Sequence, residues 1–459
     1  IANMTLEAPV TNVGNGTESA RLLATKVTST KQLNFNKATV NVSNIEAAEE
    51  VNFLNAITAE KPLNLLTPVV NVGRDETAAV VTATSLTGSA ELNFNNATIN
   101  IGMITATDSI NFRHAIKAGT NGTGNLDLRA PVIHVGVVNG EAAVPVETAV
   151  MANNVTGSAA LYLNDAALTV AGISAPVISF LGTVAATGNL TAAASDTLST
   201  ANSMITATGN VNLQAANGLT ATGGSMEAGG NIVLKSAAGM VSASSDMQAA
   251  NITLDSEDGS KVSASGSMTA TNTITLGHSG DNATAVVAVG DAAIGSSTDR
   301  VWSAKDLHIH AADNITINKT GINITGNNGV AFKSGKLDFA NSDIRSKDIL
   351  LVAAKDYDSA SKTYTMESDN TITLVDTNLT GTDSITLIGY KTNVKGDVIS
   401  KRLLGAVGES VTMNADGTDV DHYTYKQEEG ANVLVVDGDV RTSDASDLIY
   451  IKLYGDAKF

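Results

Sequence analysis

The sequence predicts an all-β chain that folds as a right-handed parallel β-helix, a solenoid of short strands in coils of about 20 residues. The first observation is a repeat: lines of the type GNxxLxAxxG recur over 209–276 with a period of about 21. The second is that each line holds short alternating apolar runs, such as Val211/Leu213 and Ile232/Leu234. A fixed period near 21 with strand-type alternation and no helical stripe is typical of a solenoid.

The strands must stack because none can bury its apolar side chains alone. A strand of four or five residues spans roughly 15 Å, so each coil has to lie against the next, with parallel strands about 4.8 Å apart. Crossovers between parallel strands are nearly always right-handed. Because an Asn opens each line, identical amides are expected to stack at the corners. The predicted structural ladder consists of Asn189, Asn210, Asn231, Asn251 and Asn272.

The first third carries a longer repeat over the short one. LEAPVTNVG at 6–14 returns as LLTPVVNVG at 65–73 and as LRAPVIHVG at 128–136. The interval between the first two copies corresponds to three coils of about 20 residues each. The third copy is stretched by an insertion at 137–152. We therefore expect 1–187 to form a β-helix built of three-coil repeats.

The remaining chain is expected to form simpler coils, followed by a C-terminal segment of different composition. The segment 188–389 shows single coils with a period of about 21, interrupted by an irregular insertion near 277–303. Beyond residue 390 the coil signal fades while lysines and tyrosines increase, so 390–459 is predicted to be a β-rich cap or a junction to another domain. In total the sequence predicts about 18 to 20 coils of strands of this kind.

Composition narrows the classes of partner. The chain has 46 acidic and 28 basic residues, a net charge of −18, and no basic stripe. Binding to nucleic acid requires clustered Lys and Arg to neutralise phosphates, so nucleic acid is not an expected partner. The chain lacks Cys, which excludes disulfides and thiolate chemistry. Residues 166–195 carry no charge over a bilayer-spanning length, but polar residues and Pro176 interrupt them, so coils are predicted there.

Few residues suggest a bound ion. His308 and His310 lie two apart and should share one face of a strand, but no third ligand accompanies them at metal-binding spacing. An acidic turn at 255–259 and the NADGTDVD segment at 414–421 offer oxygens, the latter loosely like a calcium loop without its closing glutamate. Calcium is therefore a weak expectation, and the candidate ligands are Asn414, Asp416, Asp419 and Asp421.

Catalytic motifs are not recognisable, so the sequence predicts a protein that is not an enzyme and needs no cofactor. The carboxylates are scattered in turns and do not pair with Arg or His at a recognisable spacing. The glycine-rich turn at 119–125 lacks the Lys and the helix that phosphate binding requires. The many Asn-x-Ser/Thr triplets, such as Asn96-Ala97-Thr98, follow from an Asn corner before a strand with an outward Thr.

The repeated lines over 188–276, with weaker copies to about residue 387, resemble the haemagglutinin repeats of the filamentous haemagglutinin-like family of autotransporter-type bacterial surface adhesins. The resemblance implies a rod on the cell surface or outside the cell, exported by an outer-membrane transporter through type V secretion. It would bind a glycan or protein receptor on host cells, other bacteria or matrix, or would hold a biofilm together. No functional residue carries over from the family.

Two further functions stay open at this point. One is a structural subunit that self-associates end to end into an extracellular filament through open sheet edges. The other, more distant, is a β-helix enzyme acting on polysaccharide. Receptor loops at 137–152 and 277–303 would favour the adhesin, and paired open ends would favour the filament.

Overall fold

The computed structural model describes residues 2–74, 78–136, 148–257, 260–277, 292–294, 300–317, 321–408, 410–412, 425–426, 433–437, 439–442, 450–454 and 456–458. It divides into two compact units, 1–213 and 214–459. Over these described residues the chain is all β, with no helix, and its parallel strands form about 17 solenoid turns whose coils are about 21 residues apart. The predicted fold class is confirmed.

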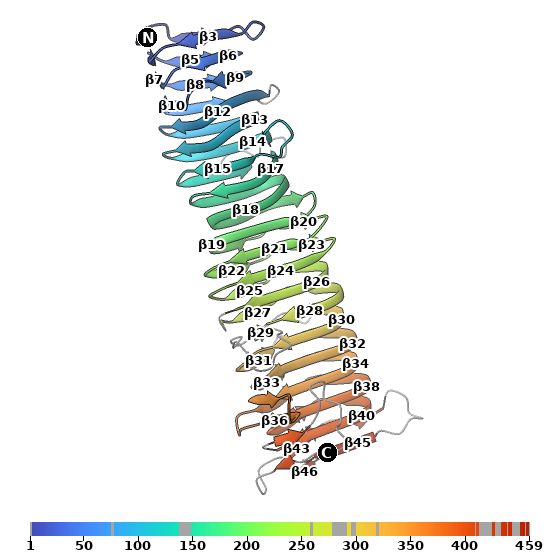
Figure 1. The fold of residues 1–459 in the computed structure, drawn as a ribbon. Coiled ribbons are helices and arrows are strands. Elements are labelled where there is room, and N and C mark those ends of the chain that lie inside the picture. The colour runs from blue at the N-terminus through green and yellow to red at the C-terminus, as the bar shows by residue number, and fades with distance from the viewer. Residues whose placement is uncertain are drawn as a thin grey trace. The chain divides into compact units, whose positions relative to one another are not determined.

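The strands of the first unit are drawn from blue to green in Figure 1. They are β1 (Met4–Leu6), β2 (Val10–Val13), β3 (Ala20–Leu23), β4 (Lys26–Ser29), β5 (Gln32–Phe35), β6 (Ala38–Asn41), β7 (Asn44–Ala47), β8 (Glu50–Phe53), β9 (Ile57–Ala59), β10 (Leu63–Leu66), β11 (Val69–Val72), β12 (Ala79–Gly88), β13 (Glu91–Ala106), β14 (Ser109–Ala118), β15 (Asn125–Arg129), β16 (Val132–Gly136), β17 (Thr148–Gly157), β18 (Ala160–Ala186), β19 (Leu190–Thr200) and β20 (Met204–Ala207), while the division between the units falls within β21 (Val211–Ala215).

Most strands of the second unit belong to its solenoid. These are β22 (Gly218–Ala221), β23 (Ser225–Ala228), β24 (Asn231–Ser236), β25 (Val241–Ala243), β26 (Asp246–Ser256), β27 (Val262–Ala264), β28 (Met268–Leu276), β29 (Ala292–Ile294), β30 (Val301–His310), β31 (Asn314–Ile317), β32 (Asn323–Ser334), β33 (Lys336–Ala340), β34 (Asp343–Ala353), β37 (Thr371–Val375), β38 (Asn378–Gly389), β39 (Lys391–Lys395), β40 (Val398–Val407), β43 (Val433–Asp437), β44 (Val440–Arg441), β45 (Tyr450–Tyr454) and β46 (Asp456–Lys458). Four more strands form a separate antiparallel sheet: β35 (Asp356–Asp358), β36 (Thr363–Thr365), β41 (Ser410–Thr412) and β42 (Tyr425–Lys426).

Coils in the first unit stack with similar, and often identical, residues in register. Strand β5 pairs in parallel with β8, which places Leu33 beside Val51 and Phe35 beside Phe53. The column that Phe35 and Phe53 begin continues inward through Val72, Phe94 and Phe112. Successive Phe rings lie close, with centroids 5.4 Å apart for the first pair. All the Phe side chains of this column are fully buried, and the burial of each one stabilises the folded chain by about 2 kcal/mol.

Positive backbone φ angles mark one corner of the repeat. The sequences LNFNK, LNFNN, NFRH and LYLND each end on the corner residue, which lies between β5 and β6 in the first copy and within β13, β14 and β18 in the others. That residue takes a left-handed φ between 51° and 60° in all four copies, which turns the chain so that the following strand changes phase by one residue. The four corner residues are Lys37, Asn96, His114 and Asp165.

The core of the second unit contains a methionine column that ends on tryptophan. Met226, Met247 and Met268 occupy the same inward position in successive coils, and Met268 lies beside Trp302 in β30. Trp302, the one tryptophan of the chain, is fully buried, and its Nε1–H donates to the carbonyl of Gly266 at 3.0 Å. The thioethers fill a narrow interior and pack favourably against the indole.

Parallel coils continue past residue 390, where the sequence signal fades. Strand β38 pairs with β40, and β40 pairs with β45, in the same parallel sense as the earlier coils. Between β34 and β37, by contrast, the chain leaves the solenoid and forms β35 and β36. This excursion uses residues without adding a coil, which helps to explain about 17 turns where the sequence predicts 18 to 20.

The uncharged stretch at 166–195 lies in β18 and β19, which pair in parallel with Ile178 beside Leu198. In the described part of the chain, the structure has no helix of the length and hydropathy needed to cross a membrane.

Candidate binding surface

An antiparallel sheet lies on the outside of the second unit, and we call its strands β35, β36, β41 and β42 the outer layer. Beneath it, Leu350 and Val352 of β34 point outward, since Ile349 and Leu351 of the same strand fill the interior. Outward positions of a solenoid strand are normally polar, so two buried apolar residues there require a cover. The outer layer supplies that cover.

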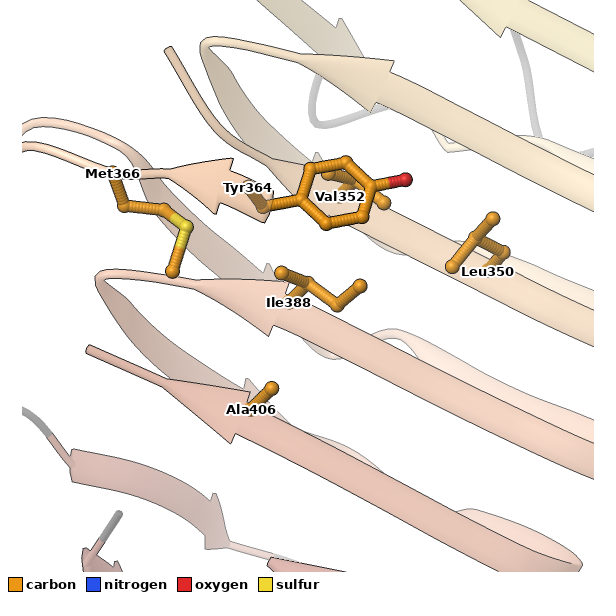
Figure 2. Packing of buried hydrophobic residues seen from close by; sticks show 6 residues of the cluster. All are labelled: Leu350, Val352, Tyr364, Met366, Ile388 and Ala406. Carbon is orange, nitrogen blue, oxygen red and sulfur yellow. The ribbon is translucent and has the colours of Figure 1, made fainter. Parts of the chain in front are cut away.

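The outer layer and the solenoid strands beneath it enclose a buried apolar cluster. Figure 2 shows Tyr364 of β36 beside Val352, with Ile388 and Ala406 on the neighbouring solenoid strands. Val352 pairs with Ile388, and Ile388 pairs with Ala406, so the cluster follows one outward column across three coils. The complete buried cluster is Leu350, Val352, Tyr364, Met366, Ile388 and Ala406.

The hairpin of β35 and β36 is fixed at its base. The Asn370 amide donates to the carbonyl of Gly335 at 2.8 Å, and its side-chain oxygen accepts from the N–H of Glu367 at 2.7 Å. The carboxylate of Glu367 also forms an ion pair with Lys355. That hydrogen bond and the negative charge of Glu367 raise the pKa of Lys355. Asn370 is buried, so these bonds tie the hairpin to the solenoid rather than to solvent.

Hydrogen bonds to the Asp358 side chain stabilise the turn at the tip of the hairpin. The Asp358 carboxylate accepts from the Ser361 hydroxyl at 2.5 Å and from the Ala360 N–H at 2.9 Å. These bonds, that from Ser361 first, lower the pKa of Asp358. Lys362 follows with a left-handed φ of 54°, and the rings of Tyr357 and Tyr364 contact each other across the two strands, tilted by 43° with centroids 4.4 Å apart. The exposed tip is therefore a defined turn.

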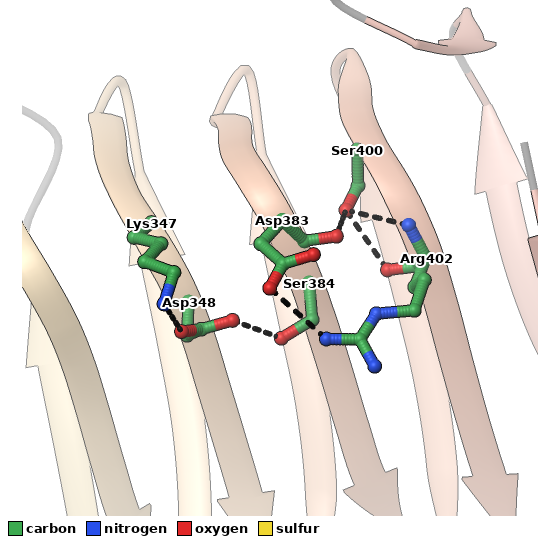
Figure 3. A network of polar contacts seen from close by, with 6 residues as sticks. All are labelled: Lys347, Asp348, Asp383, Ser384, Ser400 and Arg402. Carbon is green, nitrogen blue, oxygen red and sulfur yellow. Dashed lines mark hydrogen bonds and ion pairs between the residues drawn. The ribbon is translucent and has the colours of Figure 1, made fainter. Parts of the chain in front are cut away.

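A polar network borders the solenoid strands beneath this layer (Figure 3). Ser384 donates its hydroxyl to Asp348 at 2.5 Å, and Lys347 lies 3.9 Å from the same carboxylate. Arg402 pairs with Asp383 at 3.1 Å. These charged side chains are about half exposed, so each pair contributes roughly 0 to 1 kcal/mol. The network links neighbouring coils.

Replacing Tyr364 with leucine is expected to loosen the hairpin while leaving the solenoid intact. Leucine keeps apolar contact with the cluster but loses the ring contact with Tyr357, which costs about 1 to 2 kcal/mol. Limited proteolysis should then cut within 354–370 roughly ten times faster than in the wild type. Tyr162→Leu, which removes the ring stacked on His134 in the first unit, is the control and should leave that rate unchanged. Equal cleavage in both variants would contradict the assigned packing.

His308 and His310 share one face of β30, as the sequence predicts from their spacing, and their ring centroids are 6.4 Å apart. Burial, then the charges of Lys333 and His308, lowers the pKa of His310 to about 4. No set of three or more His, Cys, Asp or Glu side chains gathers as metal ligands within the described ranges. The acidic turn at 255–259 is described only to Glu257, where Asp255 and Glu257 both face Lys235.

The predicted Asn ladder of 188–276 is only partly in register. In the second unit Asn251 donates its amide to Asn231 at 2.7 Å. The next coil, however, places Thr273 beside Asn251, because a register shift after Ala249 moves Asn272 off the column. In the first unit the backbone N–H of Asn210 donates to the side-chain oxygen of Asn189 at 2.8 Å. Asn272 is therefore not a ladder residue.

A longer amide ladder runs through the first unit and does not appear among the predictions. Its members occupy the middle of apolar-Asn-apolar strands such as LNF and VNF, and that repeated triplet was the available signal. From the second member onward, each side-chain amide donates to the Asn oxygen of the preceding coil at 2.8 to 3.2 Å. The column then continues with the stacked rings of His134 and Tyr162. The six members are Asn12, Asn34, Asn52, Asn71, Asn93 and Asn111.

Several predicted sites lie outside the described residues. The calcium candidates Asn414, Asp416, Asp419 and Asp421 all do, and so do most of the predicted receptor loops at 137–152 and 277–303. Calcium binding therefore stays a prediction.

No protein-family model, curated protein or solved structure matches this chain, so what the structure itself establishes is a parallel β-solenoid with an outer layer on its second unit.

Proposed function

We propose that the chain is a non-enzymatic bacterial adhesin, secreted or held on the cell surface, in which the solenoid is the scaffold and the outer layer is a contact surface. The observation that carries the proposal is the excursion at 354–370. Leu337 of β33 pairs with Ile372 of β37, an interval well beyond the spacing of about 21 residues in an ordinary coil. The additional residues form a folded hairpin anchored on an outward apolar cluster.

A solenoid suits attachment because its coils repeat one surface many times. Stacked repeats create long binding surfaces without a larger core, and chain excursions place variable residues on one face. Loops held on a rigid scaffold are where proteins most often place binding residues. The hairpin tip, with Asp358, Ser361 and Lys362, is exposed and polar, which suits a glycan or protein receptor.

The proposed partners follow the family resemblance of the repeats. They are a glycan or protein receptor on host cells, on other bacteria or in the matrix, with attachment leading to aggregation or biofilm cohesion. Export through an outer-membrane transporter by type V secretion belongs to the same proposal, as does an extracellular or cell-surface location. Nucleic acid is not among the proposed partners, because the net charge of −18 would repel phosphates.

The test is binding of the full chain, coupled to fluorescent beads, to host cells, bacterial cells and immobilised matrix proteins. The wild type is expected to bind at least one of these surfaces. Met366→Ser, which places a hydroxyl in the cluster beneath the hairpin, should reduce that binding at least several-fold. Thr39→Ser, on the half-buried outward face of β6 in the first unit, is the control. Absence of binding to all three surfaces, or unchanged binding by Met366→Ser, would contradict the proposal.

A second candidate function is a structural subunit of an extracellular filament. The observation that favours it is the oriented amide ladder, because in-register stacking of identical side chains is also how separate chains join in fibrils. Negative-stain images and sedimentation separate the two functions: filaments that grow with concentration support the subunit, and particles of one chain support the adhesin. Cleavage of a polysaccharide panel by the purified chain would instead indicate the enzyme.

A further inference from the structure

His310 faces basic groups on the outside of the second unit. In β30, His308 and His310 point to the same side of the strand, with ring centroids 6.4 Å apart. In the next coil, Lys333 of β32 is the direct parallel partner of His310, so the two side chains leave adjacent strands on the same face. The His310 side chain is only partly exposed. A positive charge on this imidazole would therefore meet the ammonium of Lys333 across one strand spacing of about 4.8 Å.

Among the described residues, the strands on either side of β30 place no carboxylate directly beside His308 or His310. On the preceding coil, β28 places the uncharged Thr275 beside His308. On β30 itself, Asp306 lies four residues before His310 and accepts a hydrogen bond from the Asn328 amide at 3.4 Å. On β32, Ala331 lies beside His308. The charges that act on the pKa of His310 come from Lys333 and His308, both basic.

The same face leads directly to the outer layer. Lys333 pairs with Val352, which is buried in the cluster beneath the hairpin, and Ala331 packs against that cluster. Strand β30 also holds Trp302 in the core. Disturbing β30 at His310 would therefore affect both the core around the tryptophan and the support of the outer layer.

We propose that β30 is an acid-sensitive element: protonation of His310, held between Lys333 and His308, releases this strand from its coil and loosens the edge of the outer layer. An opened strand exposes the imidazole to water, where it gains a proton below a pKa of about 6.5. The closed strand resists protonation, so acid favours the open form.

The direction and the size of the pH effect on strand opening follow from the linkage between proton binding and opening. Burial and the neighbouring basic groups lower the pKa of His310 to about 4 in the closed form. Above pH 6.5 neither form is protonated and the opening equilibrium is constant. Between pH 6.5 and 4 only the open form binds the proton, so opening increases by roughly tenfold for each pH unit, approaching about 10²-fold.

Hydrogen exchange of the full chain tests this directly. Peptides covering 300–310 and 321–334 should be measured between pH 7.5 and 4.5, with rates corrected for the pH dependence of intrinsic exchange. We expect the opening equilibrium of both peptides to rise by roughly 10- to 100-fold on acidification, with a matching change in Trp302 fluorescence.

Variants distinguish the effect of protonating His310 from general effects of acid on the fold. His310→Gln should abolish most of the increase, and Lys333→Met, which removes one facing charge, should reduce it even if the first variant folds poorly. His134→Gln, which changes a partly buried histidine of the first unit, is the control and should leave the response intact. A wild-type response that is flat, or one that persists in both His310→Gln and Lys333→Met, would overturn the proposal.

Discussion

Gly73→Ala is expected to destabilise the coils around β11 by about 4 kcal/mol or more, a magnitude that single substitutions reach only through strain or overpacking. Gly73 has a φ of +79°, which alone costs an L-residue about 1 to 2 kcal/mol. A Cβ there would also lie 2.0 Å from the carbonyl oxygen of Asn95 and 2.3 Å from that of Asn96. Both atoms belong to the backbone of the next coil, so rotation of a side chain cannot relieve the overlap.

Gly188→Ala is the matched control for this prediction. Gly188 has a similarly left-handed φ of +98°, but a Cβ there meets nothing within 4 Å. It should cost only the conformational strain, about 1 to 2 kcal/mol. Hydrogen exchange of peptides from 69–101 in the first variant should therefore accelerate roughly 100-fold more than exchange around residue 188 in the second. Equal costs would show that close coil approach is not what requires glycine at position 73.

The sequence shows that a glycine recurs at the position of Gly73, but it does not show why only glycine fits there. LLTPVVNVG repeats at 6–14 and 128–136, and each copy ends on a glycine with positive φ. The period of about 21 and the alternating apolar residues were enough to predict parallel coils, because only stacking buries such short strands. Which backbone atom lies above each glycine depends on the register of the next coil, and a repeat length alone does not define that register.

The outer layer could not be predicted from local pattern. The KDILLVAA segment at 347–354 falls within the single coils predicted for 188–389, although Ile349 to Ala353 are all apolar where alternation is expected. An uninterrupted run means that both faces of β34 are covered. Its cover comes from Tyr364 and Met366, which follow the strand in sequence, and β36 in turn pairs with the distant strand β41. The apolar run therefore indicated that a second layer covers β34, but it did not indicate which residues form that layer.

The Asn positions show the same limit. The regular spacing of Asn189 to Asn272 predicts a ladder, but one extra residue before Thr273 shifts the register and ends the column after Asn251. In the first unit, spacings of 18 to 22 residues still keep six amides in contact, because the corners absorb the differences. Register, rather than spacing in the sequence, determines which side chains stack.

Asn52→Leu is expected to cost about 3 kcal/mol and to open the ladder on both sides of β8. The Asn52 amide donates to the oxygen of Asn34 at 2.9 Å and to Glu50 at 3.0 Å, and its oxygen accepts from Asn71 at 2.8 Å. Leucine has a similar volume but neither donates nor accepts. The Asn34 oxygen would lose its donor in a side chain that is only 7% exposed, where water cannot replace it.

Asn64→Leu distinguishes loss of the ladder from loss of any amide. Asn64 donates to Asn44 at 3.4 Å on a half-exposed column, so water can replace that bond and the expected cost is below about 1 kcal/mol. Exchange measured over 32–35 and 69–72 should rise roughly 100-fold in Asn52→Leu and only a few-fold in Asn64→Leu. Each amide of the ladder donates toward the preceding coil, so the chain of bonds has a direction, and removing one member deprives the preceding coil of a donor and the following coil of an acceptor. If the two variants behaved alike, the stacked amides would contribute no more than ordinary surface side chains, and the apolar columns alone would hold the first unit together.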